Sequence, residues 1–312
     1  MNPLAAMFGF GVRVKNTFYD RGVFRAQKLQ GPVISVGNLS VGGSGKTPFV
    51  LMLGELLKAR GIQFDILSRG YGRKTRGVAL VDPSGSPQQF GDEPLLMARR
   101  LGVPVIVGER RYEAGVFAEQ KFGPQFHLLD DGFQHRALAR DFDIVLLTSE
   151  DARDRLLPTG RLREPLTSLC RADAVVLTDD ASPAGLEGKL VWQVQRGILP
   201  SNIPPRPVIF CGIARPRNFV SQLRAVGIEP VAEKFYRDHH PYTQQDIQEL
   251  LEIRRQNDAG GFVTTEKDAI NLGPLLSMLQ PLSVVPVRME LVNAANAVDT
   301  MLSMVAKRKR LA

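Results

Sequence analysis

Residues 42–47 read Gly-Gly-Ser-Gly-Lys-Thr and lie between a predicted strand and a predicted helix. In such a loop, backbone N–H groups and a helix N-terminus converge on one point, and that arrangement binds phosphate oxygens. Lys46 can reach the β- and γ-phosphates of a nucleotide and stabilise the transferring charge, and the Thr47 hydroxyl can ligate a bridging Mg²⁺. The predicted site for ATP and Mg²⁺ therefore comprises Gly42, Gly43, Ser44, Gly45, Lys46 and Thr47.

One position departs from the usual form of this loop. The common pattern has a glycine five residues before Gly45, and this chain has Ser40 there. A glycine-rich turn with a surface lysine is the alternative interpretation. The strand before the loop and the helix after it favour the phosphate-binding interpretation.

A phosphate loop of this kind needs a second acidic position at the end of a neighbouring buried strand. Residues 126–131 read Phe-His-Leu-Leu-Asp-Asp, an apolar run that ends in two carboxylates. Asp130 or Asp131 could hold Mg²⁺ directly or through water, and the sequence leaves open which of them does. The alternative is a helix cap or a solvated turn.

The elements that must position these residues alternate along the chain. Residues 32–38 are predicted to form a buried strand, and an apolar helical pattern follows the loop and ends near Gly61. Short runs rich in Val, Ile, Leu and Phe recur at 64–67, 104–107, 126–129, 143–147 and 174–177. This alternation predicts an α/β fold like that of P-loop NTPases, with a mostly parallel sheet and helices on both faces.

A proline-dense stretch at 199–207 divides the chain, and a new alternation of strands and helices follows it. We place a boundary near 185–205, with a P-loop domain over 1–190 and a smaller α/β domain over 191–312. In the second part, Thr243 and Asp246 have the spacing of a capping box that begins a helix. A last helix from about residue 292 could pack back on the first domain.

Composition limits the kinds of partner and the cellular compartment that we expect. Forty Lys and Arg residues against 32 Asp and Glu give a formal charge of +8, which favours anionic partners. The two cysteines are far apart and lie near no histidine-rich spacing, so we expect neither a disulfide framework nor a zinc site. A reducing, cytoplasmic setting is consistent with this.

Several further motifs occur in a fixed order. They are residues 37–48 (GNLSVGGSGKTP), 68–73 (SRGYGR), 91–94 (GDEP), 130–135 (DDGFQH), 157–165, 238–239 (DH) and 265–268 (TEKD). Together they resemble the tetraacyldisaccharide 4'-kinase family over most of the chain. Ser40 is shared with the loop of that family, so the departure noted above does not weaken the resemblance.

The resemblance implies a reaction and a setting. In this family, ATP phosphorylates the 4'-hydroxyl of a tetraacylated glucosamine disaccharide 1-phosphate, a late step in lipid A synthesis. It implies Asp92 as the general base toward the sugar hydroxyl, with His239 or its neighbour His240 beside it. We therefore expect a peripheral enzyme on the cytoplasmic face of the inner membrane that contacts the lipid A precursor. We expect a monomer.

Other residues have both a functional and a plain interpretation. Taken alone, Asp92 could simply cap the helix that follows it. Arg110, Arg111 and Arg163 are candidates for phosphate or transition-state contacts, and solvated helix faces are their alternative. Arg69 and Tyr71 lie in a basic, glycine-rich loop that suits a lipid headgroup or a nucleotide phosphate, or that is simply a flexible surface loop.

Residues 1–28 combine apolar and basic side chains with a single acid, Asp20. This pattern predicts an interfacial membrane anchor rather than a span, and a helix packed on the protein core is the alternative. Two other function classes are less consistent with the sequence. A partitioning-type ATPase would carry a lysine where this chain has Val41. A nucleic-acid-binding ATPase is disfavoured because only 7% of the residues are aromatic and no recognition motif is present. No nucleic-acid partner is expected.

Overall fold

A nine-stranded sheet forms the larger part of the protein, in the order β13-β8-β7-β6-β1-β5-β2-β4-β3. The computed structural model describes residues 3–178 and 186–311. Met1 and Asn2 of the expected anchor, and residue 185 of the expected boundary region 185–205, lie outside the described residues. The strands are β1 (Val33–Asn38), β2 (Phe64–Ser68), β3 (Ala79–Leu80), β4 (Val105–Val107), β5 (Phe126–Asp130), β6 (Phe142–Thr148), β7 (Ala174–Thr178), β8 (Leu190–Ile198) and β13 (Val287–Leu291). Among the strands within residues 3–178 and 186–311, only the edge strands β13 and β3 of this sheet pair antiparallel to their neighbours.

The central strand β1 decides where the site lies. It pairs in parallel with β5 on one side and β6 on the other, and each of its residues is buried. The register sets Val36 opposite Asp130, so the carboxyl end of β5 and the loop that follows β1 meet at the same edge. Ligands of open α/β sheets bind at this edge.

Helices cover both faces of this sheet. On one face, α2 (Lys46–Ala59), α4 (Asp92–Leu101) and α9 (Ala294–Leu311) share a buried apolar cluster with Ile34 and Val36 of β1. On the other, α5 (Arg111–Phe122) packs in a cluster that includes Val33. Alternate residues of β1 thus face opposite layers. The remaining elements of this part are α1 (Pro3–Asp20), α3 (Pro87–Phe90), η1 (Asp151–Arg153) and η2 (Leu166–Arg171).

A smaller, all-parallel sheet has the order β10-β9-β11-β12. Its elements are β9 (Val208–Cys211), α6 (Pro216–Ala225), β10 (Ala232–Phe235), α7 (Gln244–Gln256), β11 (Phe262–Thr265), α8 (Glu266–Leu272), η3 (Gly273–Met278) and β12 (Leu282–Val285). The predicted capping box at the start of α7 is confirmed, because the Thr243 side chain accepts from the Asp246 N–H and the Asp246 carboxylate from the Thr243 N–H. The predicted α/β class and mostly parallel sheet are likewise confirmed.

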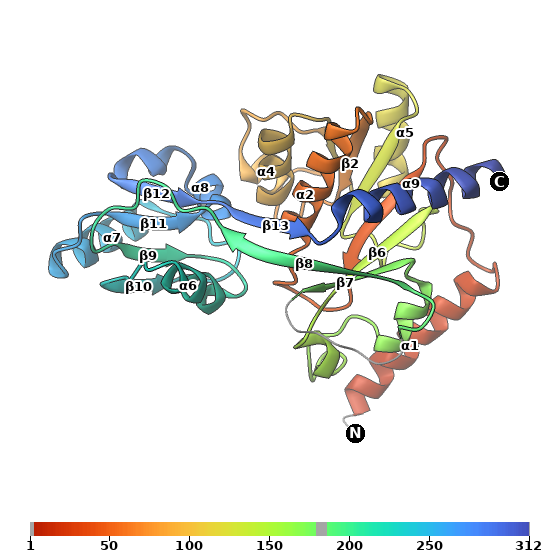
Figure 1. Ribbon diagram of the computed structural model, residues 1–312, viewed down its shortest axis with the longest axis horizontal. Helices are drawn as coiled ribbons and strands as arrows, with labels where there is room; N and C mark the ends of the chain where they lie inside the picture. The colour runs from red at the N-terminus through yellow and green to blue at the C-terminus, as the bar shows by residue number, and fades with distance from the viewer. Residues whose placement is uncertain (1–2, 179–185, 312) are drawn as a thin grey trace.

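Two strands carry the chain between the sheets. β8 leaves the larger sheet and β13 returns to it, side by side and antiparallel (Figure 1). The expected division at 190/191 thus falls at the start of β8, a strand of the larger sheet. After β13, helix α9 buries Val298, Met301 and Val305 in the cluster that contains Ile34. Within residues 3–178 and 186–311, no helix is both long and apolar enough to span a bilayer.

Candidate active site

The loop of residues 42–47 has the backbone that glycine permits. Gly42, Gly43 and Gly45 have φ values of 76°, 54° and 86°. A Cβ atom at Gly45 would lie 1.9 Å from Nη2 of Arg196, which donates to the Ser44 carbonyl at 2.7 Å. Only glycine therefore suits position 45, both for its left-handed backbone and for the close approach of the arginine.

Lys46 is held at the mouth of this loop by neighbouring polar groups. Its Nζ lies 3.0 Å from Oδ1 of Asn38 and 3.5 Å from Oδ1 of Asp131. Arg163 donates to both carboxylate oxygens of Asp131, at 2.9 and 2.8 Å, and to the Asn38 amide oxygen. Burial alone would raise the pKa of Asp131, but the charges of Lys46 and Arg163 hold that pKa well below its usual range. Asp131 thus remains ionised and fixes two cations beside the loop.

Asp130 has a different environment, although it is the adjacent residue. It is buried, and its Oδ2 accepts from the Ser68 hydroxyl at 2.9 Å. Among the residues that the structure describes, its Oδ1 has no hydrogen-bond partner. Burial, together with the nearby carboxylates of Glu93 and Asp131, raises the pKa of Asp130 to about 7. A buried carboxylate oxygen without a partner is an unfavourable state that a bound cation would relieve. The residues at this edge therefore fit a Mg²⁺ ion.

The predicted neighbour of Asp92 is His239. Nδ1 of His239 lies 2.8 Å from Oδ2 and 3.0 Å from Oδ1 of Asp92, whereas Nε2 of His240 contacts Asp246 at 3.1 Å. Asn271 donates a further hydrogen bond to Asp92 at 3.0 Å. Asp92 is also the first residue of α4, and its Oδ1 accepts from the Glu93 N–H at 2.9 Å. The carboxylate therefore both begins the helix and pairs with a histidine 147 residues away.

The charge state of Asp92 follows from these contacts. Its burial alone would raise its pKa, but the hydrogen bond from His239 and the positive charge of Lys267 more than offset this effect. The pKa of Asp92 therefore lies below its ordinary value. At neutral pH the group is an ionised carboxylate that can accept a proton.

One cavity of about 930 Å³ extends from the loop to His239 of this pair. Residues 40–48 line it, together with both aspartates of β5 and its turn, and with Arg163 and His239. Asp92 is only 4% exposed and lies behind His239. The cavity can thus hold a nucleotide phosphate at one end and a hydroxyl acceptor near the histidine.

Of the other residues predicted to contact phosphate or substrate, some lie at the cavity and one does not. Arg69 and Tyr71 line the cavity, and the Tyr71 ring centroid lies 5.2 Å from that of His239. Arg111 is buried beside the cavity, and Nη1 donates to the Gly108 carbonyl at 3.1 Å. Burial lowers the pKa of Arg111 to about 10, and the charges of Asp130 and Asp131 counteract this effect.

Arg110 lies away from these residues. Its side chain is 81% exposed and pairs with Glu113, three residues further along α5. This is the solvated helix face that was the plain alternative for Arg110.

Four other residues contribute to the site, although the sequence pattern indicates no role for them. Asn38 and Ser68 orient charged groups from the ends of β1 and β2. Arg196 on β8 and Arg215 before α6 reach the loop from the other side, and a Cβ at Gly43 would meet the Arg215 side chain at 2.8 Å. Asn38 and Ser68 lie within quoted motifs, which was a usable signal. The two arginines carry no spacing that relates them to the loop.

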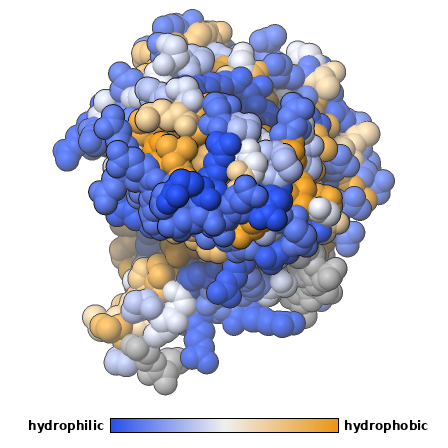
Figure 2. Space-filling view, turned by 90° about the vertical axis from the view of Figure 1, so that its left-hand side faces the viewer, coloured by the Kyte–Doolittle hydropathy of each residue, from blue (hydrophilic) through white to orange (hydrophobic). Residues whose placement is uncertain are grey.

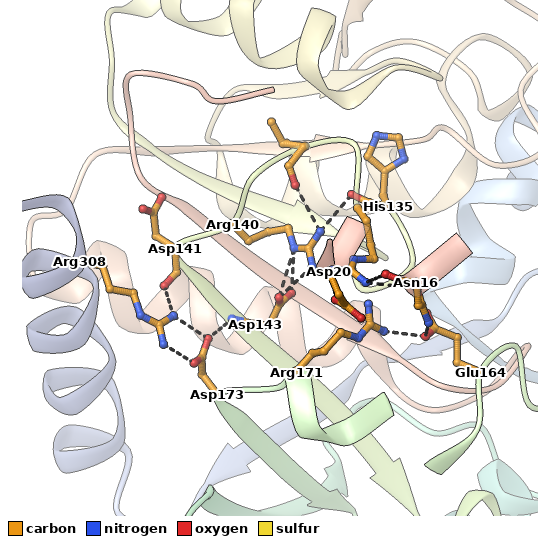
Figure 3. A network of polar contacts seen from close by, with 12 residues as sticks. Asn16, Asp20, His135, Arg140, Asp141, Asp143, Glu164, Arg171, Asp173 and Arg308 are labelled. Atoms are coloured by element: carbon orange, nitrogen blue, oxygen red, sulfur yellow. Dashed lines mark hydrogen bonds and ion pairs between the residues drawn. The ribbon is translucent and has the colours of Figure 1, made fainter. Parts of the chain in front are cut away.

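A polar network ties α1 to the site (Figure 3). Glu164, the residue after Arg163, accepts from the Asn16 amide at 2.8 Å and from Arg171 at 2.6 Å. At the other side of the view, Arg308 of α9 donates to Asp173 beside β7. Both terminal helices are therefore fixed to the larger sheet by charged hydrogen bonds, which are stronger than neutral ones.

Comparison with known proteins gives consistent results. The family model described as "Tetraacyldisaccharide-1-P 4'-kinase" matches residues 1–306. The tetraacyldisaccharide 4'-kinase of Koribacter versatilis (strain Ellin345) is 51% identical over 321 residues, covering 99% of this chain and 100% of the relative. The enzyme of that name from Aquifex aeolicus (strain VF5) is 40% identical over 289 residues, covering 86% and 88%.

A solved structure is similar as well. The apo form of LpxK from Aquifex aeolicus in complex with ATP has a TM-score of 0.80 to this chain, with 34% identity over 97% of each chain.

Replacing Lys46 tests the nucleotide end of the cavity. We expect Lys46→Ala to weaken ATP binding roughly 10–100-fold, the value of one or two lost charged hydrogen bonds, in calorimetric titration. The fold should persist because Arg163 still pairs with Asp131. Lys58→Ala, at the other end of α2, is the matched control and should bind ATP normally. Equal ATP affinity in Lys46→Ala and the control would contradict the site.

Proposed function

The chain belongs to the tetraacyldisaccharide 4'-kinase family, and we propose that the Asp92–His239 pair, Lys46 and a Mg²⁺ ion carry out its reaction in the cavity described above. The enzyme is an ATP-dependent kinase of lipid A biosynthesis. It transfers the γ-phosphoryl group of ATP to the 4'-hydroxyl of a tetraacylated glucosamine disaccharide 1-phosphate. The observation that carries the assignment of residues is the contact of His239 with Asp92 at the wall of the cavity that the phosphate loop also lines. Transfer of labelled phosphate from ATP to that purified lipid tests the activity directly.

The loop end of the cavity binds and orients the triphosphate. Backbone N–H groups of residues 42–47 and the N-terminus of α2 accommodate phosphate oxygens, and Lys46 adds a positive charge beside them. Arg163 is held by Asp131 and Asn38 at the cavity wall, where its guanidinium can pair with two phosphate oxygens. Both cations offset the charge that moves toward the leaving ADP.

Mg²⁺ is assigned to Thr47 and Asp130. Asp130 has a buried oxygen that no group in the described part of the chain contacts by a hydrogen bond, whereas Asp131 already pairs with two cations. We therefore assign Asp130 as the ligand and Asp131 as the group that orients Lys46 and Arg163. When bound, Mg²⁺ supplies charge neutralisation between the β- and γ-phosphates.

The Asp92–His239 pair receives the proton of the 4'-hydroxyl, with His239 at the cavity wall and the Asp92 carboxylate behind it. The low pKa of Asp92 keeps it ionised at neutral pH, and the hydrogen bonds from His239 and Asn271 fix its orientation. A positioned carboxylate contributes roughly 10²–10⁴-fold to such a step. Tyr71 and Arg69 line the cavity beside His239, so we assign them to the sugar or its phosphate.

Helix α1 is the proposed membrane-contacting element. Met7 and Phe10 are 70% and 69% exposed on it, and Phe18 is 40% exposed two turns later. In Figure 2 the end of α1 projects at the lower left and carries hydrophobic side chains. Basic residues accompany them at positions 13, 15, 21, 25 and 28. An apolar stripe with flanking cations suits the surface of an anionic bilayer, where the acylated substrate lies.

The base assignment predicts a specific loss of turnover. Asp92→Asn keeps the size of the side chain, so ATP binding should persist while kcat falls roughly 10²-fold or more. His239→Ala should also lower kcat, and the double variant should lose less than the product of the single losses if the pair acts as a unit. His240→Ala, which removes the adjacent histidine that contacts Asp246, should retain its activity. If Asp92→Asn had a normal kcat and lost only about 1 kcal/mol of folding stability, the effect of losing a helix cap, Asp92 would have no part in the mechanism.

The metal assignment predicts a pH-dependent Mg²⁺ requirement. Metal ligation needs the ionised carboxylate, and the pKa of Asp130 is about 7. Protonation should therefore compete with Mg²⁺ below that pH, and the half-saturating Mg²⁺ concentration should rise about tenfold from pH 8 to pH 6. Asp130→Asn should need more Mg²⁺, and its half-saturating Mg²⁺ concentration should no longer rise through protonation of residue 130. The pH dependence that comes from protonation of ATP itself should remain. An unchanged pH dependence in the variant would exclude Asp130 as the ligand.

Membrane contact by α1 can be measured with anionic phosphatidylglycerol vesicles. Met7→Ser combined with Phe10→Ser should lower the sedimented fraction, since each buried side chain contributes about 1.5–3 kcal/mol. Added salt should lower it further by screening the basic residues. Val226→Ser, a similarly exposed position beside the smaller sheet, is the control. Salt-independent binding that the double variant leaves unchanged would exclude α1 as the anchor.

A further inference from the structure

Arg215 has no role in the proposed function, although it enters the cavity from the smaller part of the protein. It follows β9 and is the N-cap residue of α6. Its side chain is only 11% exposed, and it lines the cavity together with the phosphate loop. A guanidinium group that is largely buried needs polar partners, so the groups around Arg215 indicate what it does.

The Arg215 side chain lies against the phosphate loop at Gly43. A Cβ atom at Gly43 would lie 2.8 Å from Nε, 2.9 Å from Cγ and 3.0 Å from Cδ of Arg215. At the neighbouring Gly42, a Cβ atom would lie 3.5 Å from Cβ of Ala214. The segment between β9 and α6 therefore packs directly on the loop, and the guanidinium lies beside the backbone groups that bind phosphate oxygens.

The acidic neighbours of Arg215 compensate its charge only in part. Its Nη2 lies 3.3 Å from Oε2 of Glu150 and 3.9 Å from Oδ1 of Asp151. The Glu150 side chain is 54% exposed, and the same oxygen accepts a hydrogen bond from Arg161 at 2.8 Å. Among the described residues, the buried Nε and Nη2 atoms of Arg215 have no hydrogen-bond partner. Buried donors in this state are unfavourable, and a ligand that accepts from them would relieve the cost.

Two other cations at the loop are held differently. Lys46 donates to the Asn38 amide oxygen at 3.0 Å. Arg163 donates to both carboxylate oxygens of Asp131. Arg215 is held by packing and by the charges of two carboxylates, so its Nε and Nη2 donors remain available to an anion in the cavity. The anion that this loop accommodates is the triphosphate of ATP.

We propose that Arg215 is a catalytic residue, supplied to the phosphate loop by the smaller part of the protein, whose guanidinium pairs with phosphate oxygens of ATP during transfer. The inference rests on the proposed function, because it concerns the same cavity. In the reaction, the 4'-oxygen forms a bond to the γ-phosphorus as the bond to the β,γ-bridging oxygen breaks, and the electron pair of that bond stays on ADP. The hydroxyl proton passes to the Asp92–His239 pair. In P-loop NTPases, an arginine supplied from outside the loop stabilises the charge of this transition state.

The competing interpretation is a structural link between the smaller part of the protein and η1. Asp151 is buried in η1, shortly after β6, and its Oδ2 accepts from the Thr148 N–H at 3.3 Å. In that interpretation, Arg215 serves only to join α6 to this edge of the larger sheet. The two interpretations differ in what Glu150 contributes. A structural link needs this acid, whereas a phosphate contact does not, because the acid competes with phosphate for the guanidinium.

Three variants separate the two interpretations. Arg215→Met removes the charge and the donors but keeps an unbranched side chain. Arg217→Met is the matched control, since it removes a cation from an exposed position two residues further along. Glu150→Gln removes the acidic partner and leaves Arg215 in place. A fourth variant, Arg215→Lys, keeps the charge but loses the planar fork that pairs with two oxygens.

The experiment measures kcat/KM for ATP in the full-length enzyme, with Mg²⁺ and the tetraacylated disaccharide 1-phosphate as acceptor. We expect Arg215→Met to lower kcat/KM roughly 10²–10³-fold relative to Arg217→Met, as the loss of one charged transition-state donor does. Arg215→Lys should recover only part of this loss. Glu150→Gln should have a kcat/KM equal to or higher than that of the wild type. Thermal unfolding shows which variants are folded.

Two results would overturn the inference. One is a kcat/KM for ATP in folded Arg215→Met that equals that of Arg217→Met. The other is a kcat/KM in folded Glu150→Gln that falls below the wild-type value, as a structural link requires, and this result decides the question even if Arg215→Met fails to fold. Absence of phosphate transfer by the wild-type enzyme would instead refute the proposed function, so the two failures are distinguishable.

Discussion

The burial of the Asp92 carboxylate is the constraint on which the rest of the arrangement depends. The group is 4% exposed at the first turn of α4, in the larger part of the protein. A buried charge is costly unless it is paired and hydrogen-bonded. This compensation comes from His239, in the loop between β10 and α7, and from Asn271 and Lys267 of α8, all in the smaller part of the protein. The two parts must therefore meet beside α4, and the histidine then faces the phosphate loop.

At the phosphate end, two adjacent aspartates acquire opposite properties from their surroundings. Asp131 turns toward Lys46 and Arg163, which lower its pKa, whereas burial at the end of β5 and then the neighbouring carboxylates raise the pKa of Asp130. The parallel register of β1 and β5 fixes both at the edge from which the loop emerges. Asp131 can thus orient Lys46 and Arg163, and Asp130 can bind a metal cation.

The proposed membrane-facing helix and the site belong to one connected structure. Asn16 of α1 donates to Glu164, which adjoins Arg163 at the cavity wall. Arg136, in the turn after β5, binds Asp20 at the end of the same helix at 2.7 Å. In the proposed arrangement, a helix tied at two points to the segments that form the site would set the distance between the bilayer surface and the reacting hydroxyl.

The sequence by itself determined what local pattern encodes. The phosphate loop, its flanking strand and helix, the acidic end of residues 126–131 and the capping box at Thr243 all depend on neighbours a few residues apart. Ordered motifs identified the family and pointed to Asp92. The spacing of residues in the sequence could not determine which histidine contacts Asp92 or which aspartate has a buried oxygen without a hydrogen bond from the described residues. It also could not determine that β8 and β13 join the larger sheet. Nor could it separate exposed Arg110 from buried Arg111, or reveal Lys267 as a partner of His239. Those features depend on contacts between residues far apart in the chain and on local burial, and only the tertiary structure decides them.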